Sequence, residues 1–204
     1  LVKAGGRWGA ASTFRGTLDL EECAEVREAG QLLGRPAREL AAWACGTNLL
    51  AASIGMAALN ALLPLEPRVT ASRNGRDLIG ELAPGKTVGV IGHFPFVTRL
   101  AGLCRQLLVF EREPRDPSDF PSEQMPELLP GCELVILTGT TFITQSFDQV
   151  LSCCRPGAVK IVMGPTTPCS SRLFEAGADV LCGSRVTDSG AALRTLGQGA
   201  RFRQ

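Results

Sequence analysis

Short apolar runs rich in β-branched residues recur through the second half of the chain, and this pattern restricts the fold more than any other feature. Near-continuous apolar strands separated by helix-length connections indicate a parallel sheet with helices on both faces. The sequence therefore predicts an α/β, Rossmann-like domain over residues 81–204, with strand order 3-2-1-4-5. The expected strands are 87–91 (TVGVI), 107–111 (LLVFE), 133–138 (ELVILT), 159–163 (VKIVM) and 178–182 (ADVLC), and the proline-rich segment 112–127 is expected to be mostly loop.

The first part of the chain has a helical pattern and predicts a small α+β domain over residues 1–80. A short strand is expected around RWGAAST (7–13). Pro36 suits the first turn of a helix that stops at Gly46, and Thr47 suits the cap of a second helix that ends before Pro64. Residues 64–86 contain three prolines and several charges, and we expect them to connect the two domains. Small side chains on the second helix predict a close neighbour: Gly55, Ala57, Ala58 and Ala61.

Charge and hydropathy exclude several classes of partner. The 21 basic and 20 acidic residues are spread along the chain, so we expect no nucleic-acid partner. The most apolar segment, residues 49–63, is short and carries Ser53 and Asn60, which predicts a buried helix and no membrane partner. No signal-peptide pattern is visible, which predicts a cytoplasmic protein. The chain begins at Leu1, which is compatible with a first domain that is incomplete at its N-terminus.

Eight cysteines are present, but no C-x-x-C pair occurs among them. Most lie in apolar surroundings, which predicts buried thiols that behave as small hydrophobic side chains. Metal ligation by a subset that converges in the fold stays open as the alternative. The cysteines are at positions 23, 45, 104, 132, 153, 154, 169 and 182.

Glycine, hydroxyl and charged residues follow every expected strand. The segments after the five strands read GHFPF, EREP, TGTT, GPTTPCSS and GSRVTD. Ligands of open parallel sheets bind outside the carboxyl ends of the strands, so these segments predict a ligand site at one edge. Serine and threonine are also ordinary helix caps, which is the structural alternative for either motif alone. Together they favour a site for phosphate, carboxylate or carbonyl groups.

His93 is the only histidine, and it follows the first strand and Gly92. An imidazole there could transfer protons, contact a ligand or hold a metal, although a lone histidine is often structural. Glu111 ends the second strand 19 residues after Gly92, where Rossmann-like domains place an acid that accepts a ribose hydroxyl; a solvent-facing carboxylate is the alternative. Glu113 is a weaker candidate. The fingerprints G-x-G-x-x-G and G-x-x-x-x-G-K-[ST] are absent, so no tightly held pyrophosphate is expected.

The motifs IGHFPF, VFEREP, LLPGCELVILTGTT, GPTTP and LFEAGADVLCGSRVTD, together with IGMAALNALL, resemble the putative heavy-metal-chelation family. The resemblance implies an enolase-N-terminal-like α+β domain followed by a Rossmann-like domain, with a site in the cleft between them. Thr144 stands where the family usually has asparagine, which puts an amide contact in doubt. The positions that match the family's motifs are Gly92, His93, Phe94, Pro95, Glu111, Thr138, Gly139, Thr140, Gly164, Pro165, Thr166, Asp188 and Asn60.

Three functional hypotheses follow. The first is an enzyme of condensation or hydrolysis, with His93 and Glu111 as catalytic residues, that acts on or binds a pterin-, flavin- or siderophore-like molecule in heavy-metal handling. The second is a non-enzymatic metal-binding or delivery protein with His93 and Glu111 as ligands, with or without one or more cysteines, and the third is a methyl-donor-dependent transferase. The cofactor stays open between a divalent heavy metal and a pterin- or flavin-like molecule. The expected partner is a small-molecule ligand, and a homodimer is compatible with the sequence.

Overall fold

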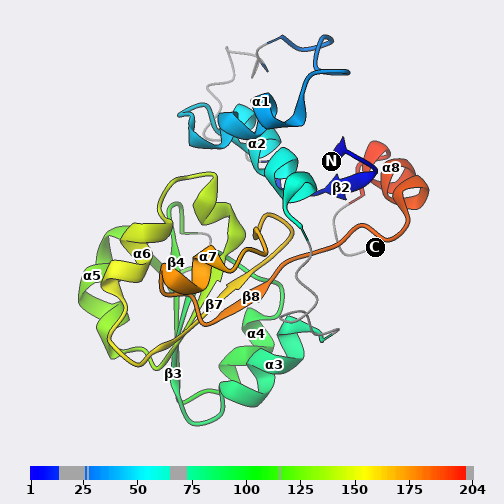
Figure 1. Cartoon of the computed structure of the whole chain (residues 1–204). Coiled ribbons are helices and arrows are strands. Elements are labelled where there is room, and N and C mark those ends of the chain that lie inside the picture. Colours follow the sequence, from blue (N-terminus) through cyan, green and yellow to red (C-terminus); the bar gives the residue numbers. More distant parts are fainter. Residues whose placement is uncertain (14–25, 27, 65–72, 115, 201–204) are drawn as a thin grey trace.

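The computed structural model describes residues 1–13, 26, 28–64, 73–114 and 116–200. Within these ranges the central feature is a six-stranded parallel sheet, with helices on both of its faces (Figure 1). The predicted α/β fold class is confirmed. In chain order the strands are β3 Thr87–Ile91, β4 Gln106–Glu111, β5 Asp119–Pro121, β6 Leu134–Thr138, β7 Val159–Met163 and β8 Val180–Cys182.

The order of the strands is β5-β4-β3-β6-β7-β8, so the predicted order 3-2-1-4-5 is wrong for the five expected strands. The third expected run, β6, pairs with β3 and not with the outer side of β4. That outer position belongs to β5, a strand inside the segment expected to be loop, where Phe120 pairs with Phe110. With β5 counted, the order becomes 3-2-1-4-5-6, which is the Rossmann arrangement.

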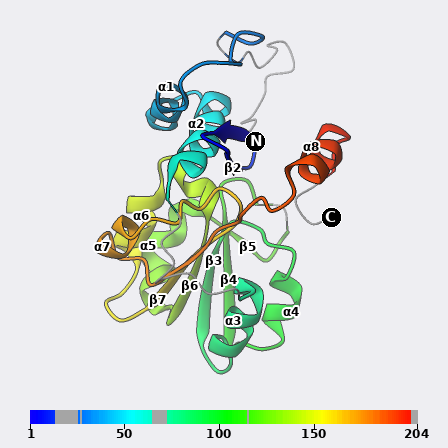
Figure 2. The same ribbon diagram turned by 45° about the vertical axis from the view of Figure 1, so that its right-hand side comes forward.

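Two apolar layers cover the faces of the sheet, because alternate residues of a strand point to opposite sides. On one face Val88 and Val90 pack with helices α3 Gly75–Leu82 and α4 Val97–Ala101. On the other face Phe110 packs with α5 Met125–Leu128 and α6 Phe147–Cys153, and α7 Arg172–Glu175 adds to this layer. All five residues of β3 are buried, which places this strand at the centre of the core (Figure 2).

Helix α3 lies inside the expected connection 64–86, so that prediction is wrong for its second half. Asn74 caps the helix by accepting a hydrogen bond from the backbone N–H of Arg76 at 3.0 Å. The apolar side chain of Ile79 is then buried against the sheet. The part of the expected connection at residues 65–72 lies outside the described residues.

The N-terminal segment consists of an antiparallel hairpin and two helices. Strand β1 Val2–Ala4 pairs with β2 Arg7–Gly9, and helix α1 Ala37–Ala42 continues into the 3₁₀ turn Trp43–Cys45 before α2 Leu49–Leu62. The cap of α2 is Asn48 and not Thr47, because the Asn48 side chain reaches the backbone N–H of Ala51 at 2.9 Å. The short strand near residue 7 is confirmed.

The close approach predicted for α2 is also confirmed. A Cβ added at Gly9 would lie 2.1 Å from the carbonyl oxygen of Ala57, and one added at Gly55 would lie 2.2 Å from the backbone nitrogen of Ala44. Small residues therefore let β2 and the turn after α1 lie directly against α2. Among the described residues no helix is both long and apolar enough to cross a membrane.

The last helix, α8 Ser189–Gly197, follows β8 and lies apart from the sheet in both views (Figures 1 and 2). None of its residues is buried, and Leu193 is 50% exposed. Asp188 caps the helix by accepting a hydrogen bond from the backbone N–H of Ala191 at 2.9 Å. This predicted ligand residue therefore has a local role at the start of α8.

Candidate functional site

A cavity of about 720 Å³ lies at the carboxyl ends of β3, β4 and β6. Its apolar wall consists of side chains from the strands and from α5 and α6, including Phe110, Met125 and Val150. Thr47 and Leu49 reach it from the N-terminal segment. The cavity is of the size that encloses small-molecule ligands. It lies where the order of strands along the sheet reverses, between β3 and β6, and Rossmann-like folds bind ligands at this topological switch point.

Hydroxyl groups line the side of the cavity that follows β6. Thr138 ends the strand, and its Oγ1 accepts hydrogen bonds from the backbone N–H and the hydroxyl of Thr140, at 3.4 and 3.1 Å. Further along, the hydroxyls of Thr144 and Ser146 are 2.9 Å apart and share a hydrogen bond. The hydroxyls are oriented by their neighbours, so this wall offers a fixed set of donors and acceptors to a ligand.

Two carboxylates and one guanidinium also line the cavity, and they follow β4 and β5, which lie on the other side of β3 from β6. Glu111 ends β4, Arg112 follows it, and Glu123 lies in the 3₁₀ turn Ser122–Gln124. Among the residues that the structure describes, no ion pair holds the carboxylate of Glu111. An ionised carboxylate accepts hydrogen bonds only, so Glu111 is suited to the N–H or O–H groups of a ligand.

Gly92 lies between β3 and the wall formed by Thr138. Its φ of +93° is a conformation that favours glycine, and an added Cβ would lie 2.9 Å from Cγ2 of Thr138. Four of the predicted site residues thus come together around one cavity: Gly92, Glu111, Thr138 and Thr140.

Gly139 is buried in the 3₁₀ turn Gly139–Phe142, which follows Thr138, and it does not line the cavity. An added Cβ would lie 2.6 Å from the backbone nitrogen of Thr167, so Gly139 lets the segments after β6 and β7 pack tightly. Its role in the structure is to hold the wall that carries Thr138 and Thr140.

His93 lies outside the residues that line the cavity. Its Nδ1 is 3.7 Å from Oδ1 of Asp119, whose side chain is only 1% exposed, while the histidine side chain is 36% exposed. The imidazole therefore faces the edge strand β5. Its proposed catalytic and metal-binding roles stay predictions, because the geometry gives it a carboxylate neighbour but no place on the cavity wall.

Phe94 and Pro95 also lie away from the cavity. The ring of Phe94 stacks on that of Phe96, with centroids 5.2 Å apart, and both rings pack against the layer under α3 and α4. Pro95 is exposed in the same turn. The two phenylalanines therefore belong to the apolar layer on the face of the sheet that α3 and α4 cover.

The segment after β7 contacts the N-terminal segment. Nδ2 of Asn60 donates to the carbonyl of Ala10 at 2.8 Å and lies 3.2 and 3.4 Å from the carbonyls of Thr166 and Pro165. The Thr166 hydroxyl accepts a hydrogen bond from the backbone N–H of Ser12 at 2.9 Å. Gly164 begins this segment with a φ of +118°. These predicted ligand residues link two parts of the chain and do not line the cavity.

Metal ligands do not gather in the described part of the chain. Within it no group of three or more histidine, cysteine, aspartate or glutamate side chains is arranged to hold an ion. His93 and Asp119 supply only two donors, whereas a structural zinc site takes four. The described side chains therefore do not fit a tightly held metal.

The buried-thiol prediction holds for only some of the cysteines. Burial raises the pKa of Cys132 and of Cys154 to about 11, so both remain protonated and unreactive at neutral pH. Cys45 and Cys169 are exposed, which that prediction did not anticipate. Cys23 lies outside the described residues.

Several cavity residues were missed by the sequence reasoning. Arg112, Ser122 and Glu123 fall in the segment 112–127 that is predicted to be mostly loop, and Glu123 is one of five carboxylates in that segment, so its charge alone was a weak signal. Thr144, where the sequence departs from the family pattern, also lines the cavity. The other missed residues are Thr47, Leu49, Ile91, Phe110, Met125, Thr141, Ser146, Gln149 and Val150.

The fold and cavity define a Rossmann-like protein with a small-molecule cavity at its switch point. Two family models, both described as putative heavy-metal chelation, match residues 1–63 and 76–204. Since the second match covers more than half of the chain, the chain belongs to the putative heavy-metal-chelation family, and the predicted resemblance is confirmed.

Two solved structures from this family, both described as having unknown function, have the same fold. The protein from Desulfitobacterium hafniense is 27% identical, with a TM-score of 0.73 over 85% of this chain and 73% of its own. The protein from Pyrococcus horikoshii is 22% identical, with a TM-score of 0.70 over 86% of this chain and 74% of its own. No curated protein matches the chain.

Proposed function

We propose that this chain binds a flat, polar metabolite of the pterin or flavin kind in the cavity between β3, β4 and β6. One observation carries the proposal: the carboxylate of Glu111, which has no ion-pair partner among the described residues, lines the same cavity as the row of hydroxyls that begins at Thr138, with β4 and β6 on either side of β3. Pterins and flavins present N–H groups along one edge, which a carboxylate accepts, and carbonyl oxygens, which hydroxyls and backbone N–H groups satisfy. A volume of about 720 Å³ is large enough for such a ring system.

The apolar wall supports a flat ligand. Phe110, Met125 and Val150 give the cavity a surface without hydrogen-bonding groups, against which the face of a ring system would lie. Apolar walls with a few placed polar groups are typical of small-molecule sites. The polar groups of the cavity would thus orient the ligand, while the apolar wall would exclude water from the faces of the ligand's ring system.

In the enzymatic form of this proposal, Glu111 would act as general base in a condensation or hydrolysis. Its carboxylate lies close to where the N–H or O–H of the ligand would lie, and Glu123 supplies a second carboxylate on the same wall. The proposal does not require His93, which faces Asp119.

The family description favours metal binding as a second candidate function. A ligand that itself chelates metal, as siderophore-like molecules do, would reconcile that description with a cavity that lacks three protein donors among the described residues. A methyl-donor-dependent transferase ranks third, since the glycine-rich first loop is missing from the sequence.

Mass spectrometry of the small molecules released from untagged protein purified without chelators tests the proposal. We expect one heteroaromatic compound in near-stoichiometric amount, and elemental analysis of the same sample reports any metal. Metal without an organic ligand would favour the second candidate. Absence of any such compound, together with no binding of pterins or flavins to the purified chain, would overturn the proposal.

A further inference from the structure

A second, smaller cavity of about 290 Å³ lies between helices α3 and α4, on the face of the sheet opposite to the first cavity. The two cavities share no lining residue. The walls of the second come from the layer that contains Ile79 and Leu100, whereas the first is lined by Phe110 and Met125 of the other layer. A ligand in the second cavity would therefore be independent of the function proposed above.

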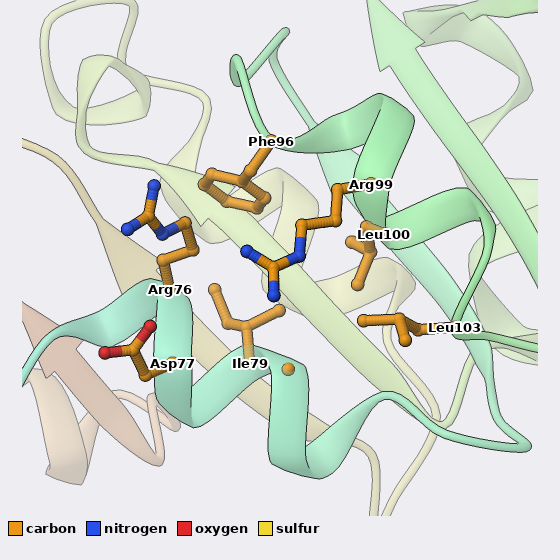
Figure 3. A pocket seen from close by; sticks show the side chains of 8 residues that line it. Arg76, Asp77, Ile79, Phe96, Arg99, Leu100 and Leu103 are labelled. Carbon is orange, nitrogen blue, oxygen red and sulfur yellow. The ribbon is translucent and has the colours of Figure 1, made fainter.

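Two guanidinium groups converge on this second cavity from facing helices. Arg76 extends from α3 and Arg99 from α4, and the ring of Phe96 lies between and above them (Figure 3). Within the part of the chain that the structure describes, neither guanidinium has an ion-pair or hydrogen-bond partner. Two cations held near one another without a counter-ion repel each other, so an anion between them would be favoured.

One carboxylate, Asp77, also lines the cavity. In Figure 3 it lies on the outer side of Arg76 and away from Arg99. The residues that line the cavity therefore carry a net charge of +1, from two arginines and one aspartate. The next acidic group on α3, Glu81, forms an ion pair with Arg73 and is engaged there.

The remainder of the lining is apolar and suits a ring. Phe96 is held in place by stacking on Phe94, and the floor consists of Ile79, Leu100 and Leu103, the last of which is 41% exposed. Gly80 also lines the groove without a side chain, and no atom lies within 4 Å of a Cβ added there. A guanidinium binds a carboxylate or phosphate through two parallel hydrogen bonds and also stacks on flat rings.

From this arrangement we infer that the groove between α3 and α4 is a binding site for a small aromatic anion. Its ligand is a carboxylate or phosphate attached to a ring, held by Arg76 and Arg99 with the ring against Phe96 and the apolar floor. The volume is near the lower end for small-molecule cavities, which fits an aromatic acid or a single nucleotide and not a dinucleotide.

Calorimetric titration with matched probes tests this inference. The probes are benzoate and adenosine monophosphate, each compared with its uncharged counterpart, benzamide and adenosine. At least one anion should bind about tenfold or more tightly than its counterpart, since charge-assisted hydrogen bonds supply that difference, and added salt should weaken it. Binding by benzoate identifies an aromatic acid, and binding by adenosine monophosphate alone identifies a nucleotide.

Variants locate the binding. Arg76→Gln and Arg99→Gln should each reduce the affinity for the anion to that of the uncharged probe, and Gly80→Leu should block the groove without removing a charge. Arg38→Gln is the matched control, because Arg38 is an exposed arginine on α1 at the other end of the molecule (Figure 1). Unchanged melting temperatures would show that the variants fold. Equal binding of charged and uncharged probes, no binding of either anion at millimolar concentration, or an equal loss in Arg38→Gln would overturn the inference.

Discussion

Asn60 is, with Ser53, one of two polar residues in the apolar helix α2, and its side-chain amide joins distant parts of the chain. Nδ2 donates to the carbonyl of Ala10 and lies within 3.2 Å of the carbonyl of Thr166. Its Oδ1 is buried and has no hydrogen-bond partner among the residues that the structure describes, and the same is true of the hydroxyl of Thr167. The amide therefore contributes donors to a crowded group of backbone carbonyls, at the cost of one unsatisfied oxygen.

We predict that Asn60→Leu lowers the free energy of unfolding by about 1–3 kcal/mol, because the carbonyl of Ala10 loses its donor inside the protein. Asn60→Asp should cost more, since it brings a negative charge towards carbonyl oxygens. Urea denaturation followed by circular dichroism measures both. Gln124→Ala, at an exposed side chain of the surface, is the control and should change stability by less than about 0.5 kcal/mol. Equal, small effects at positions 60 and 124 would contradict the role given to Asn60.

At the scale of elements, the hairpin β1–β2 lies against α2 because glycine occupies position 9. A Cβ there would lie 2.1 and 2.3 Å from backbone atoms of Ala57 and Ala61, which cannot move independently of the helix. The guanidinium of Arg7 strengthens the same contact, since Nε and Nη2 donate to the carbonyls of Ala61 and Leu62 at 3.1 and 2.7 Å. The end of α2 is thus capped by the hairpin.

We predict that Gly9→Ala destabilises the protein by about 1–3 kcal/mol, since backbone atoms must separate to admit the methyl group. Gly80→Ala is the matched control, because Gly80 lies in helix α3 with open space around it. That change should stabilise the protein by about 0.5–1 kcal/mol, as alanine favours the helix. Thermal unfolding of the two variants measures the difference. A stability equal to wild type for Gly9→Ala would show that β2 does not rely on this contact.

The sequence pattern predicted the elements with long apolar runs and missed those that depend on tertiary pairing. The strands β3, β4, β6, β7 and β8 have near-continuous apolar runs, which are typical of buried parallel strands. Strand β5 has only the residues Asp-Phe-Pro, and it is a strand because its backbone pairs with β4. Local composition cannot show such a pairing, and for that reason the strand order was predicted with one strand missing.

At the scale of the whole molecule, the sequence located the edge of the sheet that carries the cavity but not all of its wall. Gly92, Glu111, Thr138 and Thr140 were found because parallel strands bring their carboxyl ends together. His93 was predicted to belong to the site because it is the only histidine, but residue type alone does not determine which way a side chain points after a turn.

The cavity residues that come from other segments of the chain could not be predicted from the sequence. Thr47 and Leu49 reach the cavity from the N-terminal segment, and Glu123 comes from the turn after β5. Thr47 and Leu49 are far from Glu123 in sequence, and their meeting depends on how the segments pack. The segment GPTT is predicted to contact the ligand, and in the structure its Thr166 contacts Ser12 and Asn60. Residues that follow a strand can therefore form packing contacts between two segments of the chain as well as contacts with a ligand.

The central claim is that Glu111 holds a pterin- or flavin-like ligand at the edge of the sheet, and titration of Glu111→Gln against Glu113→Gln tests it most directly. Glu113 is an exposed carboxylate two residues away that does not line the cavity, so the two variants differ in position and not in charge. With pterin or riboflavin as the probe, calorimetry should show an affinity about tenfold or more lower for Glu111→Gln, the loss expected for a hydrogen bond to a charged group. Glu113→Gln should bind as the wild-type chain does. Equal affinities of the two variants for a probe that the wild-type chain binds would contradict the account.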